Sequence, residues 1–420
     1  MSREPYITVI DIGSNTTKLC VVKESSENPD KIQVLVLLER ESAGIKKGVI
    51  TNMSELTDTL IDLANQAETV IGLPIKKAVL GINTSTINFT NSEGMAVISG
   101  VENEVTLSDV DRAVQDSLNK AFAIQNNEIL HLITKNFIVD GQLGIRNPIG
   151  MIANKIEVRT LIISCETSYI RNFNKVFNQA SLDASSIVFT PLASSDFCLS
   201  VKQKKSGTVL IDLGYASTSF IVWENDEVVT SGVIPVGSDH ITSDLAVGLQ
   251  TNIEMAEEIK KNFLNFDSEP EVETVEVFNP DTQNNERFST SEIHAFSKPR
   301  IEEIFLLIYK ELRSVGKNSL PGGAVLIGGG AELKGVTQVA KEVLRIPAFK
   351  YNFDANQVDF IPDYNGNLSF ANAITLGYYS YHNSSNNANL KGNNRKAKPP
   401  HNEGEDTNIW EIIKKLLPFT

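Results

Sequence analysis

One pattern occurs twice in this chain, and it limits which folds the chain can adopt. An apolar strand, an Asp-x-Gly turn, small polar residues and a second strand follow one another at residues 6–22 and again at residues 209–223. A single such turn would be typical of an ordinary hairpin. Two copies and a third glycine cluster at residues 327–331 predict a duplicated α/β domain. Because such turns expose backbone N–H groups to phosphate, and paired aspartates can hold a hydrated cation, the pattern predicts a nucleotide site.

The composition is that of an ordinary soluble globular protein. The chain has 420 residues, which predicts roughly two to four domains. Its net charge of −14 argues against nucleic-acid binding through general electrostatics. The cysteines Cys20, Cys165 and Cys198 lie in apolar runs and are predicted to be buried thiols in a reducing compartment. The first residues carry no signal peptide and no apolar run is long enough to span a membrane, so we expect a cytosolic chain.

The order of the predicted elements indicates two lobes with inserted subdomains. Strands are predicted at residues 6–12, 19–23 and 32–40, and amphipathic helices at residues 109–122 and from residues 297–300 to about residue 312. The predicted organisation is a first lobe at residues 1–83 and 164–208, an inserted α+β subdomain at 84–163, a second lobe at 209–239 and 320–381, a further subdomain at 240–319, a disordered linker at 382–407 and a terminal helix at 408–420.

The last segment of the chain has the pattern of a membrane-binding helix. The preceding residues are rich in Asn, Ser, Gly, Lys and Pro, which predicts a flexible linker with a typical reach of about 30 Å. Residues 408–420 are amphipathic, with an apolar side that suits the headgroup boundary and lysines that suit anionic lipid. Docking on the protein itself or in a partner's groove is the alternative. The residues predicted to contact the membrane are Ile409, Trp410, Ile412, Ile413, Lys414, Leu416, Leu417 and Phe419.

Taken together, these features make the chain similar to the FtsA family of actin-like bacterial division proteins. The paired turns alone would indicate only the wider actin-like ATPase superfamily. The replaced second subdomain and the terminal helix resemble FtsA more specifically, and the resemblance covers nearly the whole chain. The segments that carry it are Asn136–Gln142, Asn147–Met151, Pro191–Ser195, Val236–Ala246, Ala256–Lys261 and Ser369–Gly377.

The resemblance implies an α/β fold of the actin-like (ribonuclease H-like) type, a duplicated two-lobed ATPase fold with an α+β insertion and a C-terminal amphipathic helix. It implies a protein that binds ATP and Mg²⁺ in a central cleft and polymerises head to tail. It further implies a peripheral location on the cytoplasmic face of the cell membrane, at the mid-cell division septum. There the protein would bind anionic lipid, tether the FtsZ C-terminal tail and recruit later divisome proteins. No nucleic-acid partner is implied.

The family's functional positions can be transferred to this sequence residue by residue. Asp11 and Asp212 would hold Mg²⁺ through water, and the glycines would let the backbone approach the nucleoside. Ser14, Lys18, Ser217 and Thr218 would face the phosphates, and Glu257, Lys260 and Lys261 would contact the ribose or the base. For Lys260 and Lys261 a solvated helix face is the alternative. The subdomain at residues 240–319 would contribute to the nucleotide site and bind the acidic FtsZ tail. Arg300 is the candidate contact for that tail, with a surface ion pair as the alternative. The implied nucleotide-binding residues are Asp11, Gly13, Ser14, Asn15, Thr16, Lys18, Asp212, Gly214, Tyr215, Ser217, Thr218, Glu257, Lys260, Lys261, Gly328, Gly329 and Gly330.

The sequence also departs from the family pattern. Tyr215 and Ala216 stand where glycines are common, so the backbone approaches phosphate less freely. Thr16 replaces the usual lysine, and Lys18 follows two residues later. No glutamate precedes the Pro-Leu-Ala-Ser-Ser segment, and Asp196 is the nearest candidate for a catalytic acid. We therefore expect ATP binding with weak or no ATPase activity.

Two other functions remain open from the sequence. One is a phosphotransferase or an exopolyphosphatase-like enzyme. The Asp-Ile-Gly-Ser-Asn segment at residues 11–15 is similar to that of the exopolyphosphatase-like class. Such an enzyme would need an acid beside the second turn, where residues 215–219 offer none. The other is a cytoplasmic scaffold similar to PilM, which shares the core but lacks the long linker and the lipid-binding tail.

Overall fold

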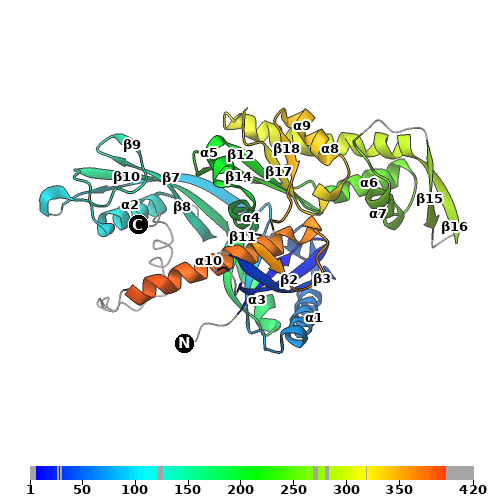
Figure 1. Ribbon diagram of the computed structural model, residues 1–420, viewed down its shortest axis with the longest axis horizontal. Coiled ribbons are helices and arrows are strands. Elements are labelled where there is room, and N and C mark those ends of the chain that lie inside the picture. Colours follow the sequence, from blue (N-terminus) through cyan, green and yellow to red (C-terminus); the bar gives the residue numbers. More distant parts are fainter. Residues whose placement is uncertain are drawn as a thin grey trace. The chain divides into compact units, whose positions relative to one another are not determined.

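The computed structural model describes residues 6–25, 28, 31–99, 101–121, 126–267, 273–279, 283–317, 319–354 and 356–393 (Figure 1). The chain forms two compact units. The first comprises residues up to Ser85 and from Val176 to Tyr378. The second comprises Thr86–Lys175 and the described residues from Tyr379 onward. The residues predicted to bind membrane, 408–420, lie outside the described residues.

The first unit contains a six-stranded mixed sheet with the order β11-β6-β1-β2-β3-β19. Strands β1, β2 and β3 are antiparallel neighbours, and β6 and β11 are parallel to β1 on its other side. The central strands are long apolar runs because the sheet is covered on both faces. The strands are β1 (Ile7–Ile12), β2 (Thr16–Glu24), β3 (Ile32–Glu41), β6 (Lys77–Ile82), β11 (Asp183–Phe189) and β19 (Val358–Phe360).

A second sheet in the same unit repeats this arrangement. Its order is β14-β13-β12-β17-β18, with an antiparallel meander of β12, β13 and β14, and with β17 and β18 parallel to β12. The pairing matches that of β3-β2-β1-β6-β11 strand for strand, so the predicted duplication is confirmed. The strands are β12 (Thr208–Leu213), β13 (Thr218–Glu224), β14 (Glu227–Ile234), β17 (Ala324–Ile327) and β18 (Ala348–Lys350).

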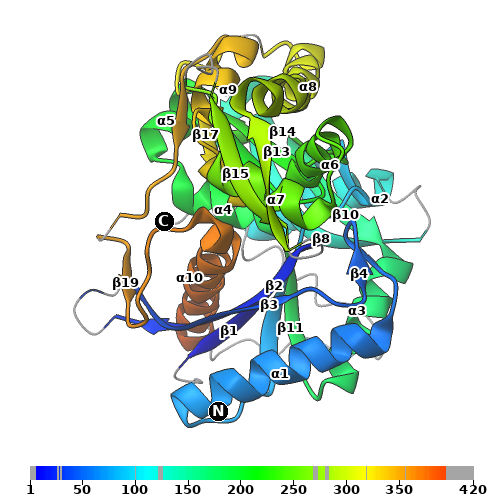
Figure 2. The same ribbon diagram turned by 90° about the vertical axis from the view of Figure 1, so that its right-hand side faces the viewer.

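Helices α1 and α10 lie on opposite faces of the first sheet (Figure 2). Helix α1 (Met53–Ile71) begins where the Asn52 side chain accepts hydrogen bonds from two backbone N–H groups, and it ends at Gly72 in the left-handed conformation. Helix α10 (Ala371–Asn393) lies so close to the first sheet that a Cβ at Gly377 would be 2.8 Å from the Val22 side chain. The first helical turns of α10 are thereby fixed against the sheet that carries the first Asp-x-Gly turn.

The remaining elements of the first unit connect or extend the two sheets. Helix α6 contacts α7 and α8, and α8 contacts α9, so these helices form one packed group. The elements are β4 (Ile45–Lys46), β5 (Val49–Ile50), α4 (Thr190–Cys198), α5 (Val201–Ser206), α6 (Ser238–Gly248), α7 (Ile253–Asn262), the hairpin β15 (Thr274–Asn279) and β16 (Asn284–Ser289), α8 (Thr290–Ser314), α9 (Val336–Leu344), and the 3-10 turns η2 (Gly329–Glu332) and η3 (Leu368–Phe370). Helix α3 (Thr167–Gln179) joins the two units in sequence.

Helix α8 begins earlier than predicted. The expectation of a start at residues 297–300 was wrong, because α8 begins at Thr290 and carries Pro299 in its interior. A proline inside a helix removes one hydrogen bond and usually ends the helix. Here the buried positions Ile293, Ser297 and Ile301 continue at helical spacing across the proline, so packing outweighs this local cost.

Two further boundaries differ from those predicted. Strand β19 falls in the range assigned to the second lobe, yet it pairs in parallel with β3 of the first sheet. Pairing of this kind covers an open sheet edge, and a three-residue strand carries no sequence signal of its own. Helix α10 continues to Asn393, so the first residues of the expected linker are helical. No proline interrupts the chain between α10's first residue and Asn393, and composition alone therefore placed the boundary too early.

The second unit is built on a four-stranded antiparallel sheet with the order β7-β10-β8-β9. Helix α2 packs on β7 and β10 over a core that includes Val114, Phe137 and Ile156. The predicted helix and strands of an α+β insertion are present here. The elements are β7 (Ile87–Val97), η1 (Val101–Asn103), α2 (Leu107–Ala121), β8 (Asn127–Val139), β9 (Gln142–Ile145) and β10 (Lys155–Glu166). Among the described helices of the whole chain, none combines the length and apolar character needed to cross a membrane.

Replacing Gly94 with alanine is expected to destabilise this second unit by at least about 3 kcal/mol. Helix α2 lies so close to β7 that a Cβ at Gly94 would lie 1.9 Å from the Ala113 carbonyl oxygen and 2.4 Å from the Ser117 nitrogen. The matched control is Ser92→Ala, which removes only the bond from Ser92 Oγ to the Ser117 carbonyl, at 2.7 Å, for about 1 kcal/mol. Urea unfolding of both variants checks this, and equal stabilities would contradict it.

Candidate functional site

The two Asp-x-Gly turns have the same hydrogen-bonded geometry. The Gly13 N–H donates to the Thr16 carbonyl at 3.2 Å, and the Gly214 N–H donates to the Ser217 carbonyl at 3.1 Å. A Cβ would lie 2.7 Å from the acceptor oxygen at Gly13 and 2.6 Å from it at Gly214. Both turns therefore require glycine, and each orients an aspartate at the end of the preceding strand.

Both of these aspartates are buried. Asp11 is 8% exposed and Asp212 is 3% exposed. Burial raises the pKa of Asp11 to about 6, against the attraction of Lys18 and with the help of the negative charge of Asp212. Burial also raises the pKa of Asp212, against hydrogen bonds from two asparagines and the attraction of Lys18. The negative charge of Asp212 thus acts on Asp11, which fits a pair of carboxylates around one cation.

Two asparagines that sequence reasoning missed hold Asp212. Its Oδ2 accepts from Asn83 Nδ2 at 3.2 Å and from Asn372 Nδ2 at 2.9 Å. Among the described residues no donor reaches its Oδ1, which is buried. Asn83 directly follows β6, and Asn372 is in the first turn of α10. Asn372 lies within the FtsA-like segment Ser369–Gly377, so that segment was the available signal, whereas Asn83 had none.

The glycine cluster packs against the second turn. Gly328 has φ of 86°, and a Cβ there would lie 2.3 Å from Asp212 Oδ1 and 2.7 Å from the Leu213 carbonyl oxygen. Gly330 also packs on Leu213, because a Cβ at Gly330 would lie 2.9 Å from the Leu213 Cβ. Gly329 differs, because its Cβ would meet only the Ser369 side chain, at 3.7 Å. The cluster therefore brings backbone next to Asp212 and leaves space around Gly329.

Several predicted phosphate-binding side chains have partners within the protein. Lys18 is 6% exposed, and its Nζ donates to Thr16 Oγ1 at 2.5 Å. Ser14 Oγ accepts from the Gly48 N–H at 3.1 Å, and Thr218 Oγ1 donates to the Val236 carbonyl at 2.8 Å. The Thr218 hydroxyl has thus used its one donor, whereas Ser14 only accepts and Lys18 has further N–H groups, so these two can still donate to phosphate. Asn15 and Ser217 serve the turns through their backbone, because the Asn15 carbonyl accepts from the Ser42 N–H and the Ser217 carbonyl from Gly214.

The predicted ribose and base residues form one polar cluster beside the second turn. Glu257 accepts from Thr242 Oγ1 at 2.6 Å and pairs with Lys260 at 2.6 Å and with Lys261 at 3.2 Å. Burial lowers the pKa of Lys260, although Glu257 opposes this. Lys260 is 4% exposed and its Nζ lies 5.6 Å from the centroid of the Tyr215 ring, so a solvated face is excluded for it. Lys261 is exposed.

Asp196 and Arg300 have ion-pair partners elsewhere in the first unit. Asp196 Oδ1 accepts from Lys204 Nζ at 2.8 Å, and its contacts within the described chain do not include either turn. This argues against the predicted catalytic role, because the carboxylate stabilises the α4–α5 connection instead. Arg300 binds both oxygens of Asp244, at 2.6 and 3.0 Å, and it also contacts Glu303 at 2.5 Å.

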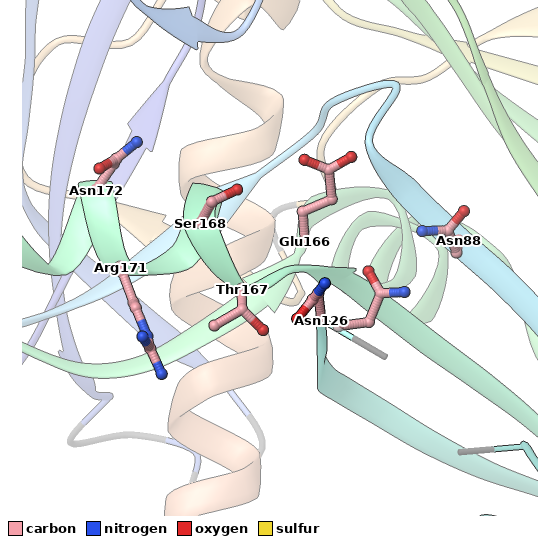
Figure 3. Close-up of a pocket in the computed structure, with 8 residues that line it drawn as sticks. Asn88, Asn126, Glu166, Thr167, Ser168, Arg171 and Asn172 are labelled. Carbon is pink, nitrogen blue, oxygen red and sulfur yellow. The ribbon is translucent and has the colours of Figure 1, made fainter. Parts of the chain in front are cut away.

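One cavity of about 690 Å³ lies in the second unit (Figure 3). Amide and hydroxyl side chains from β7, β8 and α3 line it, together with Glu166 at the end of β10 and Arg171 of α3. Within the described residues, no group of three or more His, Cys, Asp or Glu side chains could hold a metal ion directly. The paired aspartates of the turns therefore remain the candidates for a cation held through water.

Comparisons with known proteins identify relatives of this chain. The family profile "Cell division protein FtsA" matches residues 209–374, and the profile "SHS2 domain inserted in FTSA" matches residues 84–164. The chain is 33% identical over 346 residues to the cell division protein FtsA of Bacillus subtilis. This match covers 82% of this chain and 78% of that protein. It is 31% identical over 350 residues to the protein of the same name in Neisseria meningitidis, with 82% and 83% covered.

Solved structures with low sequence identity share the fold. A chain of the PilM–PilN type IV pilus biogenesis complex superposes with a TM-score of 0.62 at 14% identity, covering 88% of this chain and 97% of that one. MreB5 of Spiroplasma citri bound to ADP superposes with a TM-score of 0.51 at 11% identity, covering 92% and 98%. The fold is therefore actin-like, with an SHS2 insertion. The identity to the curated relatives over most of their length shows that this chain belongs to the FtsA family of cell division proteins.

Proposed function

We propose that this protein binds ATP with Mg²⁺ between its two Asp-x-Gly turns and acts in cell division as a nucleotide-dependent polymer. The observation that carries the proposal is the pair of buried aspartates, Asp11 and Asp212, near the ends of equivalent strands, with Gly328 packed against Asp212. Structures of MreB5, which shares the fold, are bound to ADP and to AMPPNP. Asp-x-Gly turns like the two in this chain expose backbone N–H groups that suit phosphate.

The residues present fit a hydrated magnesium ion. Asp212 Oδ1 is buried without a hydrogen-bond partner among the described residues, and such an atom is costly unless a ligand satisfies it. Asp11 and Asp212 would hold the ion through water, and the ion would neutralise phosphate charge. Lys18 supplies a further positive charge close to both carboxylates.

Nucleotide would act mainly as a conformational ligand, with hydrolysis weak or absent. Tyr215 and Ala216 occupy positions of the second turn where glycine would allow closer backbone approach. Asp196, the nearest candidate acid, is engaged by Lys204. A nucleotide that contacts both turns favours the closed conformation. If this conformation is the one that polymerises, nucleotide binding promotes self-association.

The proposed partners are the FtsZ C-terminal tail, a second copy of this chain, anionic lipid and later divisome proteins. For FtsZ, the helices α6, α7 and α8 are the proposed region, with Arg300 as the candidate contact. An acidic tail would have to exchange with Asp244, which already accepts hydrogen bonds from Nε and Nη2 of Arg300. The proposed location is the cytoplasmic face of the cell membrane at the division septum.

The full chain is expected to float with liposomes that contain anionic lipid, and a chain truncated after Asp406 is expected to stay in solution. The terminal residues 408–420 carry the amphipathic pattern, and one short helix binds weakly. Several copies on a polymer bind strongly through avidity, so Mg-ATP should increase the floated fraction. Flotation with and without nucleotide measures both effects. Equal behaviour of the two chains would reject the membrane tether and favour a helix that docks on protein.

A further inference from the structure

The strongest unassigned feature is the way the carboxylate of Asp212 is held. Asp212 is carried by β12, and donors from two other elements reach its Oδ2. These donors are Asn83, at the end of β6, and Asn372, in α10. Sequence separations of 129 and 160 residues mean that only the folded chain creates this contact. The second oxygen, Oδ1, receives no donor from the described residues and faces the backbone of Gly328.

The asparagines are themselves fixed by further hydrogen bonds. Asn83 Nδ2 also donates to Ser219 Oγ at 2.9 Å, on the strand that follows the second turn. Asn372 Oδ1 accepts from Ser194 Oγ at 3.1 Å, and Ser194 Oγ lies 2.8 Å from Thr375 Oγ1. Ser194 and Thr375 are fully buried. The amide groups therefore cannot rotate freely, and each presents its N–H to Asp212 in a set direction.

The choice of amides has a chemical consequence. An arginine or lysine in the same place would neutralise the carboxylate and compete with a cation. An amide N–H donates a hydrogen bond but carries no net charge, so Asp212 is oriented and keeps its attraction for a cation. Positioning groups of this kind are what a hydrated metal needs from residues around its ligands.

We propose that Asn83 and Asn372 are positioning residues that hold Asp212 Oδ2, so that Oδ1 is presented to the cation–nucleotide complex. This inference rests on the proposed function. It predicts that the two amides matter for nucleotide bound with Mg²⁺ and hardly at all for nucleotide without it, because Asp212 reaches the ligand through the cation shell.

The test is calorimetric titration of the full chain with ADP, once with Mg²⁺ and once with EDTA. Asn372→Ala and Asn83→Ala should each weaken Mg-ADP binding at least about tenfold, the value of one lost hydrogen bond to a charged group. Binding in EDTA should change less than about twofold in both. Asn372→Gln keeps the amide and should recover part of the loss. The matched control is Asn356→Ala, whose exposed side chain donates to Asp354 Oδ1 at 2.8 Å.

A double-mutant cycle separates positioning from general damage to the fold. In an Asp212→Asn background, Asn372→Ala should have no further effect on Mg-ADP affinity, because the carboxylate that it positions is already absent. Equal losses with Mg²⁺ and with EDTA, or full additivity in the cycle, would overturn the positioning role. If the unmodified chain bound no Mg-nucleotide at all, the proposed function itself would fail, and the two outcomes are distinct. If an alanine variant does not fold, Asn372→Ser and Asn83→Ser, which also remove the amide, provide the same comparison.

Discussion

Replacing Asp11 with asparagine is expected to abolish Mg-nucleotide binding and, at the same time, to stabilise the nucleotide-free protein. Asp11 is buried, and its pKa is raised from 3.8 to about 6. Keeping it ionised at neutral pH therefore costs roughly 3 kcal/mol of folding free energy. Asparagine has the same shape without the charge, so we expect a gain of about 2 kcal/mol near pH 7.5. Loss of one of the paired charges should weaken Mg-ADP binding at least about 100-fold.

The gain in stability should depend on pH in a defined direction. Because the native pKa of Asp11 lies above its unfolded value, the folded state binds the proton more tightly, and stability falls as pH rises between 3.8 and about 6. The penalty is absent below that window and complete above it. Urea unfolding of the wild-type and Asp11→Asn chains at about pH 5 and about pH 7.5 should show the larger difference at the higher pH.

The matched control for this experiment is Asp62→Asn. Asp62 is an exposed carboxylate of α1 whose pKa is lowered by the hydrogen bond from Arg40. Its replacement should give no gain in stability and leave Mg-ADP affinity unchanged, since it lies outside the nucleotide site. A difference between wild type and Asp11→Asn that did not grow with pH would show that Asp11 carries no such penalty. Unchanged Mg-ADP affinity in Asp11→Asn would remove it from the cation site.

Replacing Gly328 with alanine is expected to destabilise the protein by about 3 kcal/mol and to prevent Mg-nucleotide binding. Two costs add. The φ of 86° places the residue where an L side chain is strained, at about 1–2 kcal/mol. The new Cβ would also lie 2.3 Å from Asp212 Oδ1 and 2.7 Å from the Leu213 carbonyl oxygen, so the carboxylate or the turn must move. Circular dichroism during urea unfolding gives the stability, and calorimetry gives the affinity.

The adjacent glycine supplies the control for stability. Gly329→Ala adds the same methyl group one residue later, where its nearest neighbour would be the Ser369 side chain at an ordinary contact distance of 3.7 Å. We expect its unfolding free energy to stay within about 0.5 kcal/mol of wild type after allowing for the lower chain entropy of alanine. If the two alanine variants were equally stable, close packing of Gly328 on Asp212 would be disproved.

Local pattern was enough to predict the repeated part of the fold. The apolar strands, the Asp-x-Gly turns and the glycine cluster all depend on residues close together in the chain, and their periodicity and backbone requirements appear directly in the sequence. The duplicated sheets and the need for Gly13 and Gly214 follow from this. The resemblance to FtsA rested on other local segments, such as Asn136–Gln142 and Ser369–Gly377, and on the terminal helix.

Tertiary structure decided what lies around those turns. Asn83 and Asn372 contact Asp212 across 129 and 160 residues, and no local pattern marks an amide as the partner of a distant carboxylate. The ion pair of Asp196 with Lys204 likewise depends on how α4 meets α5. A helix that continues through Pro299 depends on buried contacts that only the packed group of helices supplies. The sequence by itself thus determined the two turns and their aspartates, because hydrogen bonding within a few residues sets them. Only the folded chain determined which side chains hold those aspartates, because burial and pairing of distant groups are properties of the packed molecule.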